Sequence, residues 1–300
     1  MSDPKIPSRC LPGLLLAAGL LAAGAAQAER VGAYHAYLTP EGWAQRGRVA
    51  PTEAAAGSVL YYGGSVIGNV KLVSVMWGAN VRSTTVSGIP GFSAALVNSS
   101  YVDQMAEYDT FLRAVDGRRG TKQHIQRGSY LGQVQITPAN TSKSLSNADV
   151  VAELTGQIAA GVLPPQDPDT LYMVYFPADT SVTIDGLRSC THFGAYHFAS
   201  KTKRMRPDNI LFSVEPDCGY SFNTITFIAA HEFVEAVTDA IPTPGSNPAY
   251  PQAWNTSNGY EVADLCSNSG SLMTATATYS VSQFYRNTTA ACSTGNYTSP

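Results

Sequence analysis

The segment Thr226–Asp239 constrains the fold of this 300-residue chain most, because it is almost entirely apolar and yet carries ionisable side chains. Those ionisable side chains are His231, Glu232, Glu235 and Asp239. A helix this apolar is buried on most of its faces. Buried charges are unfavourable unless they are paired or bound to a metal ion. The fold must therefore place this helix in the core and compensate its charges.

The spacing within this segment indicates how the charges are compensated. His231 and Glu235 are four residues apart, so they project from one helix face one turn apart and can bind a single cation. Glu232 is rotated by about 100° from His231 and can lie beside the ion. The pattern is that of H-E-x-x-H metallohydrolases, in which the glutamate activates a metal-bound water. Here Glu235 stands in place of the second histidine, and carboxylate oxygens also ligate zinc.

A third ligand must come from elsewhere in the chain. Glu261, within the segment Gly259–Asp264, is our first choice. Asp264 is then placed to orient His231. Asp239, two turns along the helix from His231, and His197, in an expected strand, are the alternative ligands. One histidine and two glutamates would neutralise Zn²⁺ and make it a weaker Lewis acid than neutral ligands would.

Two other interpretations of the same residues stay open. His231, Glu235 and Asp239 can form a hydrogen-bonded network in the core without any metal. They can also form a structural site of the calcium type, which holds an ion without catalysis.

Residues 1–28 have the features of a secretory signal peptide. Lys5 and Arg9 give a positive start, 11–25 is apolar, and 26–28 is a small-x-small cleavage site. The apolar run is shorter than the roughly 20 residues that span a membrane. We therefore expect an exported protein, secreted or periplasmic, with no membrane span.

Four cysteines remain after removal of the signal peptide, and an even number in an exported protein predicts two disulfides. Of the three possible pairings we favour Cys190–Cys218 and Cys266–Cys292, because each pair brackets one contiguous segment. The close C-x₂₋₄-C spacing of cysteine metal sites is absent.

The rest of the chain indicates mixed α and β layers in one α+β domain, residues 58–300, preceded by a loose lead at 29–57. The formal charge is −3 with no basic block, which argues against nucleic acid and anionic membranes as partners. Apolar and β-branched runs predict strands at 69–77, 129–136, 171–176, 193–199 and 209–214, and helical spacing predicts helices at 89–115, 147–160 and 223–239.

Seven short segments, in order along residues 58–295, together resemble the bacterial branch of the phosphate-induced, EXORDIUM-like protein family. They are 62–67 with the strand ending at Trp77, 127–132, 171–177, 194–197, 230–239, 260–266 and 283–287. This resemblance implies secretion and a single domain. The helix around His231 also resembles the active-site helix of zincin metallopeptidases, and Glu261 with Asp264 is similar to the third-ligand segment of the thermolysin-like group. That likeness implies a zincin-like fold.

These observations predict an exported domain that binds a divalent metal, zinc by preference, through His231, Glu235 and Glu261. Glu232 would take a proton from the attacking water and deliver it to the leaving amine. The substrate would be a peptide or another acyl compound. The second hypothesis is a secreted factor without catalysis, which binds cell-wall material or another cell-surface component.

Overall fold

The apolar run at 69–77 forms strand β3 (Asn69–Trp77), the centre of the parallel part of a sheet. The computed structural model describes Met1 and residues 36–45, 58–242 and 247–300. Apart from Met1, the expected signal peptide lies outside the described residues. Strands β4 (Gln126–Ile136) and β6 (Thr170–Tyr175) pair with β3 in parallel.

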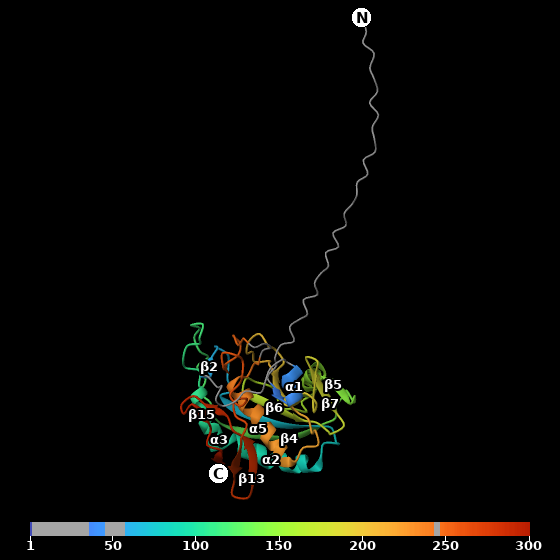
Figure 1. Ribbon diagram of the computed structural model, residues 1–300. Coiled ribbons are helices and arrows are strands. Elements are labelled where there is room, and N and C mark those ends of the chain that lie inside the picture. Colours follow the sequence, from blue (N-terminus) through green and yellow to red (C-terminus); the bar gives the residue numbers. More distant parts are fainter. Residues whose placement is uncertain (2–35, 46–57, 243–246) are drawn as a thin grey trace. The chain divides into compact units, whose positions relative to one another are not determined.

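The sheet becomes mixed beyond β6. Strand β10 (Leu211–Glu215) continues the parallel part, whereas β9 (Phe193–Ala199) and β1 (Ala36–Leu38) pair antiparallel. The order of the six strands is β1-β9-β10-β6-β3-β4, and Figure 1 shows helices packed beside this sheet. Mixed strand directions and separate helices confirm the expected α+β class.

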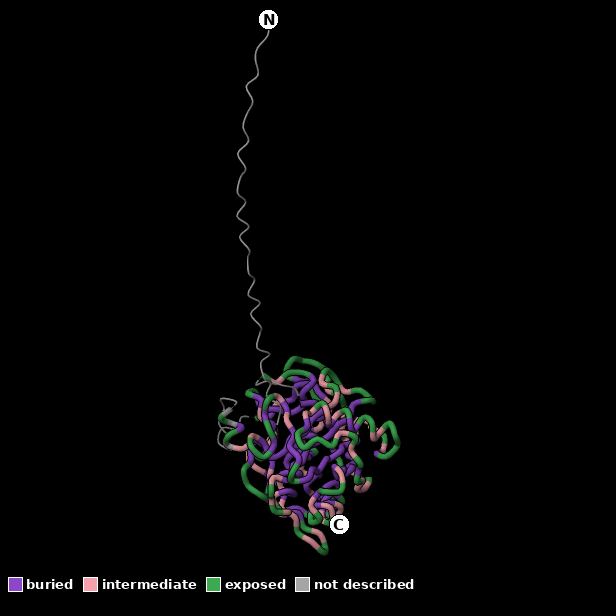
Figure 2. The backbone as a smooth tube through the Cα atoms, turned by 90° about the vertical axis from the view of Figure 1, so that its right-hand side faces the viewer, coloured by how far each residue is buried: buried purple, intermediate pink, exposed green. Residues whose placement is uncertain are grey.

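Apolar side chains cover both faces of the sheet, so each face has its own core. Successive residues of a strand point to opposite faces. Leu72 therefore packs in the core that holds helix α2 (Ser83–Val97) and helix α5 (Phe222–Thr238). Val73 packs in the opposite core, with helix α4 (Asn147–Ala159). Figure 2 shows the buried segments gathered in the interior and the exposed ones at the periphery.

Helix α5 is buried on most sides, as its composition predicts. Its N-terminus is capped by Ser221, whose hydroxyl accepts a hydrogen bond from the amide of Thr224. A three-stranded sheet covers its side away from the main sheet, and the Thr226 hydroxyl donates to the Ser280 carbonyl of that sheet at 2.8 Å. This small sheet consists of β12 (Ser269–Met273), β13 (Thr278–Ser282) and β16 (Asn296–Thr298).

One expected helix is wrong in its extent. The segment 89–115 is not one helix: α2 begins at Ser83 and ends at Val97, and the short helices α3 (Ser100–Asp103) and η2 (Gln104–Tyr108) follow it. Buried residues of α3 and η2 continue the helical spacing beyond the end of α2. The sequence pattern therefore does not reveal the break between the helices.

The expected lead at 29–57 also contains regular structure. Within its described part, β1 pairs with β9 and α1 (Pro40–Gln45) follows. The remaining strands are short: β2 (Leu60–Tyr61), β5 (Ser144–Ser146), β7 (Ser181–Ile184), β8 (Leu187–Arg188), β11 (Trp254–Asn255), β14 (Tyr285–Arg286) and β15 (Ala291–Cys292).

Both predicted disulfides are present. Cys190–Cys218 joins the turn between β8 and β9 to the loop that precedes α5, and Cys266–Cys292 joins the segment after β11 to β15. Such bridges are typical of exported proteins. Among the described residues, none of the helices has the length and apolar character needed to cross a membrane.

Candidate metal centre

Helix α5 brings two expected ligands together by its own geometry. His231 and Glu235 lie one turn apart, and His231 Nε2 is 3.0 Å from Glu235 Oε1. Their side chains are 3% and 0% exposed. Among the described residues, neither ring nitrogen of His231 has a hydrogen-bond partner, and neither oxygen of Glu235 has one of good geometry. Buried polar atoms are rarely left in this state, and this pair belongs to a group that could hold a metal ion.

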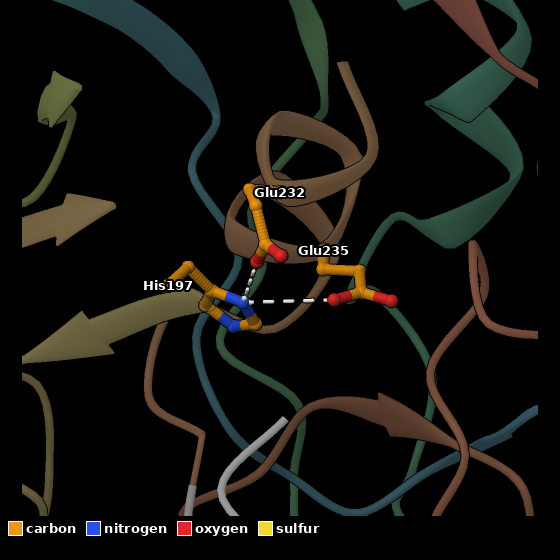
Figure 3. A group of neighbouring side chains, drawn as sticks. All are labelled: His197, Glu232 and Glu235. Atoms are coloured by element: carbon orange, nitrogen blue, oxygen red, sulfur yellow. Dashed lines mark hydrogen bonds and ion pairs between the residues drawn. The ribbon is translucent and has the colours of Figure 1, made fainter. Parts of the chain in front are cut away.

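His197 approaches the same helix from strand β9. Tyr196 and Phe198 point into the opposite core, so the alternation of the strand turns His197 toward α5. His197 Nδ1 lies 3.4 Å from Glu232 Oε2 and 3.7 Å from Glu235 Oε2. Figure 3 shows the His197 ring and these two carboxylates turned toward one another.

The loop after β11 supplies two more carboxylates. Asp264 Oδ1 is 3.8 Å from His231 Nε2, whereas Glu261 Oε1 is 3.6 Å from His197 Nε2. The Glu261 amide donates to Asp264 Oδ2 at 3.2 Å, which fixes the two residues relative to each other. The residue that faces His231 is therefore Asp264, and Glu261 lies on the His197 side.

Within the described part of the chain, two groups of three residues could each hold an ion. They are His231, Glu235 and Asp264, and His197, Glu232 and Glu235, with the ligand atoms of each group within 4.8 Å of one another. The trio expected from the sequence, which included Glu261 in place of Asp264, is not one of the two groups. A ligand role for Glu261 stays a prediction.

Asp239, the alternative ligand on the helix, is engaged elsewhere. Its two carboxylate oxygens accept hydrogen bonds from the Ala253 amide at 2.9 Å and from Asn255 Nδ2 at 2.7 Å. Burial raises the pKa of Asp239 to about 8. The carboxylate thereby ties the C-terminal end of α5 to the segment around β11.

The electrostatics of the cluster favour a bound cation. Burial, first of all, raises the pKa of Glu232, Glu235 and Glu261 well above the usual range, and neighbouring carboxylates add to it. Burial also lowers the pKa of His197 to about 3, so that its ring is neutral. No lysine or arginine of the described residues forms an ion pair with Glu232 or Glu235.

The distances also suit metal ligands. Bonds of about 2.0–2.1 Å at a tetrahedral angle separate neighbouring ligand atoms by roughly 3.3 Å. The nitrogen–oxygen distances in the two groups are 3.0, 3.4, 3.7 and 3.8 Å. Three of these exceed the 2.7–3.2 Å range of ordinary N–H···O hydrogen bonds. A neutral imidazole with carboxylates is a ligand set that zinc accepts.

Two residues of the centre were not predicted. Tyr37 of β1 donates its backbone amide to Glu232 Oε1 at 3.1 Å, and its ring packs edge-on against His231 with centroids 5.1 Å apart. Glu215, at the end of β10, is buried behind the cluster, accepts a hydrogen bond from the Ser213 hydroxyl at 2.7 Å, and has its pKa raised to about 8 by burial. An acidic residue that ends an apolar strand was the available signal for Glu215, whereas nothing local marks Tyr37.

Comparison of the chain with protein-family models, with curated proteins and with solved structures finds no match in any of the three. The function must therefore be inferred from the residues of the centre themselves.

Proposed function

We propose that this protein is an exported metal-dependent hydrolase, with zinc as the preferred ion and a peptide or another acyl compound as substrate. One observation carries the proposal: the ligand atoms of His231 and Glu235 lie 3.0 Å apart in the core, without hydrogen-bond partners of good geometry among the described residues. The disulfides are compatible with export, which the EXORDIUM-like resemblance of the sequence also implies. The zincin-like resemblance of the helix around His231 supports a metal-dependent hydrolase.

The roles of the residues follow from their positions. His231, Glu235 and Asp264 would hold the ion, with Glu261 as the alternative third ligand. When bound, the ion supplies a Lewis acid and lowers the pKa of water. Glu232 accepts the proton of the attacking water and delivers it to the leaving amine. The Tyr37 amide binds Glu232 Oε1, so that Oε2 points toward the centre.

Glu232→Gln tests this assignment, because glutamine keeps the size and hydrogen bonding of the side chain but accepts no proton. We expect hydrolysis of a broad peptide library to fall by about 10²–10⁴. Metal content, measured by mass spectrometry of the purified protein, should stay unchanged. Glu153→Gln is the matched control, since Glu153 is a buried residue of α4 outside the centre, and it should keep full activity. Full activity in Glu232→Gln would refute the role of Glu232 as the catalytic base.

The depth of the cluster favours a second candidate function. Glu232, Glu235 and Glu261 are 0% exposed, which suits an ion that stabilises the fold of a secreted, cell-surface-binding factor without catalysis. That function predicts no hydrolysis by the wild-type protein, together with a lower melting temperature after removal of the metal. A metal-loaded wild-type protein that hydrolyses the library excludes it.

A further inference from the structure

We propose that the centre has a second cation position, formed by His197, Glu232 and Glu235, which shares Glu235 with the first position at His231 and Asp264. This second position goes beyond the proposed function, which needs one ion. It rests on that function only in its expected effect on Glu232 as the catalytic base.

Glu235 is placed to bridge two ions. Its Oε1 lies 3.0 Å from His231 Nε2, whereas its Oε2 lies 3.7 Å from His197 Nδ1. The two oxygens of one carboxylate thus face two different imidazoles. In two-metal hydrolytic sites the ions lie about 3.5–4 Å apart, a separation that a bridging carboxylate spans.

The orientation of His197 leaves one ring nitrogen available as a ligand. Its Nε2 lies 3.3 Å from the carbonyl oxygen of Asp239, so this nitrogen carries the proton and donates it. Metal-binding histidines commonly donate their other N–H to a carbonyl in this way. Nδ1 then presents a lone pair to Glu232 and Glu235, and Figure 3 shows the ring of His197 facing both carboxylates. A lone pair that faces two carboxylates is repelled by them unless a proton or a cation lies between.

Glu232 is held ready for the same ion. The Tyr37 amide occupies Oε1, and Oε2 faces His197 at 3.4 Å. All three side chains are at most 1% exposed, so the position is enclosed by protein rather than by solvent. The rigid strand β9 supplies one ligand and α5 supplies two, which fixes the position before any ion arrives.

Occupation of the second position has a consequence for the proposed hydrolase. Glu232 Oε2 cannot ligate an ion and accept a proton from water at the same time. An ion at the first position alone therefore supports activity, and an ion at the second position as well inhibits it. We expect activity to rise with the first equivalent of metal and to decline at higher metal concentration.

Titration of the metal-free, full-length protein with Co²⁺, followed by its visible absorption, tests the proposal without assuming any activity. We expect the wild-type signal to saturate at two ions per chain. His197→Ala and His231→Ala should each saturate at one, whereas Glu235→Ala should lose both positions because it is shared. His124→Ala, an exposed histidine paired with Asp109 outside the centre, is the matched control and should keep two. Circular dichroism confirms that each variant is folded.

The possible failures are distinct. Saturation of the wild-type protein at one ion, lost in His231→Ala and kept in His197→Ala, overturns the second position and leaves the proposed hydrolase intact. Two ions in His197→Ala would place the second ion elsewhere and equally overturn the proposal. Absence of any bound ion in the wild-type protein overturns both.

Discussion

At the scale of single residues, the charge of the buried side chains determines what the centre can bind. Burial favours the protonated form of Glu232 and Glu235, and only a proton or a cation can relieve that cost. Binding of a metal must therefore displace protons from these side chains. The two histidines differ in their surroundings: His197 donates to a main-chain carbonyl, whereas neither ring nitrogen of His231 has a hydrogen-bond partner among the described residues.

Glu215 gives a test of this electrostatic argument away from the expected ligands. Burial raises its pKa to about 8, so between about pH 4.5 and pH 8 the folded protein holds a proton that the unfolded chain has released. Its contribution to stability is full below the unfolded pKa and is lost as the pH rises through the folded pKa. In the metal-free protein, Glu215 alone should lower the free energy of unfolding by up to about 1.4 kcal/mol per pH unit in this window.

Glu215→Gln resembles the protonated side chain and should make that slope shallower by up to about 1.4 kcal/mol per pH unit, because the other buried carboxyls still contribute to it. Urea unfolding of the metal-free wild-type and Glu215→Gln proteins at several pH values measures this change. An unchanged pH slope in Glu215→Gln would contradict the raised pKa.

At the scale of secondary-structure elements, what the sequence could predict depends on whether the signal was local. The relation between His231, Glu232 and Glu235 follows from helix geometry alone, so the α5 part of the centre was predictable. The position of His197 depends on how β9 pairs with β10 and on which face of β9 points toward α5. The sequence of the segment alone does not specify that pairing. Glu261 and Asp264 lie in a loop without a repeating geometry, so spacing could not tell which of them faces His231.

Gly194 of β9 allows a test of how β1 is held beside the centre. A Cβ at this position would lie 3.0 Å from Tyr37 Cδ1 and 3.3 Å from Ile228 Cδ1. Side chains of β1 and α5 therefore pack closely against the backbone of Gly194. We expect Gly194→Ala to destabilise the protein by about 1–3 kcal/mol through overpacking. It should also weaken metal binding, because Tyr37 holds Glu232 and packs on His231.

Gly156→Ala is the matched control. Gly156 lies in α4 with no atom within 4 Å of an added Cβ, so alanine should stabilise the protein by about 0.5–1 kcal/mol through helix propensity. Thermal melting and metal titration of both variants measure the difference. Equal melting temperatures for the two variants would show that β1 does not depend on this close approach.

At the scale of the whole molecule, the centre joins parts of the chain that are far apart in the sequence. Strand β1, strand β9, helix α5 and the loop with Asp264 all contribute to it. The disulfide Cys266–Cys292 anchors the C-terminal end of that loop, two residues after Asp264. An ion bound between these parts is lost on unfolding, so its binding free energy adds to the stability of the fold.

Removal of the metal should therefore lower the melting temperature. An ion present at 100 times its dissociation constant stabilises the folded state by about 2.7 kcal/mol. For a chain of this size that corresponds to a shift of roughly 5–10 °C. The shift should be largest near about pH 8 and shrink toward about pH 5, because protons compete with the ion for carboxylates whose pKa is raised. Differential scanning fluorimetry with and without a chelator measures it. His231→Ala/Glu235→Ala, which lacks both helix ligands of the first position and the carboxylate shared with the second, should not respond. A wild-type melting temperature that the chelator leaves unchanged at both pH values would mean that the buried carboxylates are compensated by protons alone.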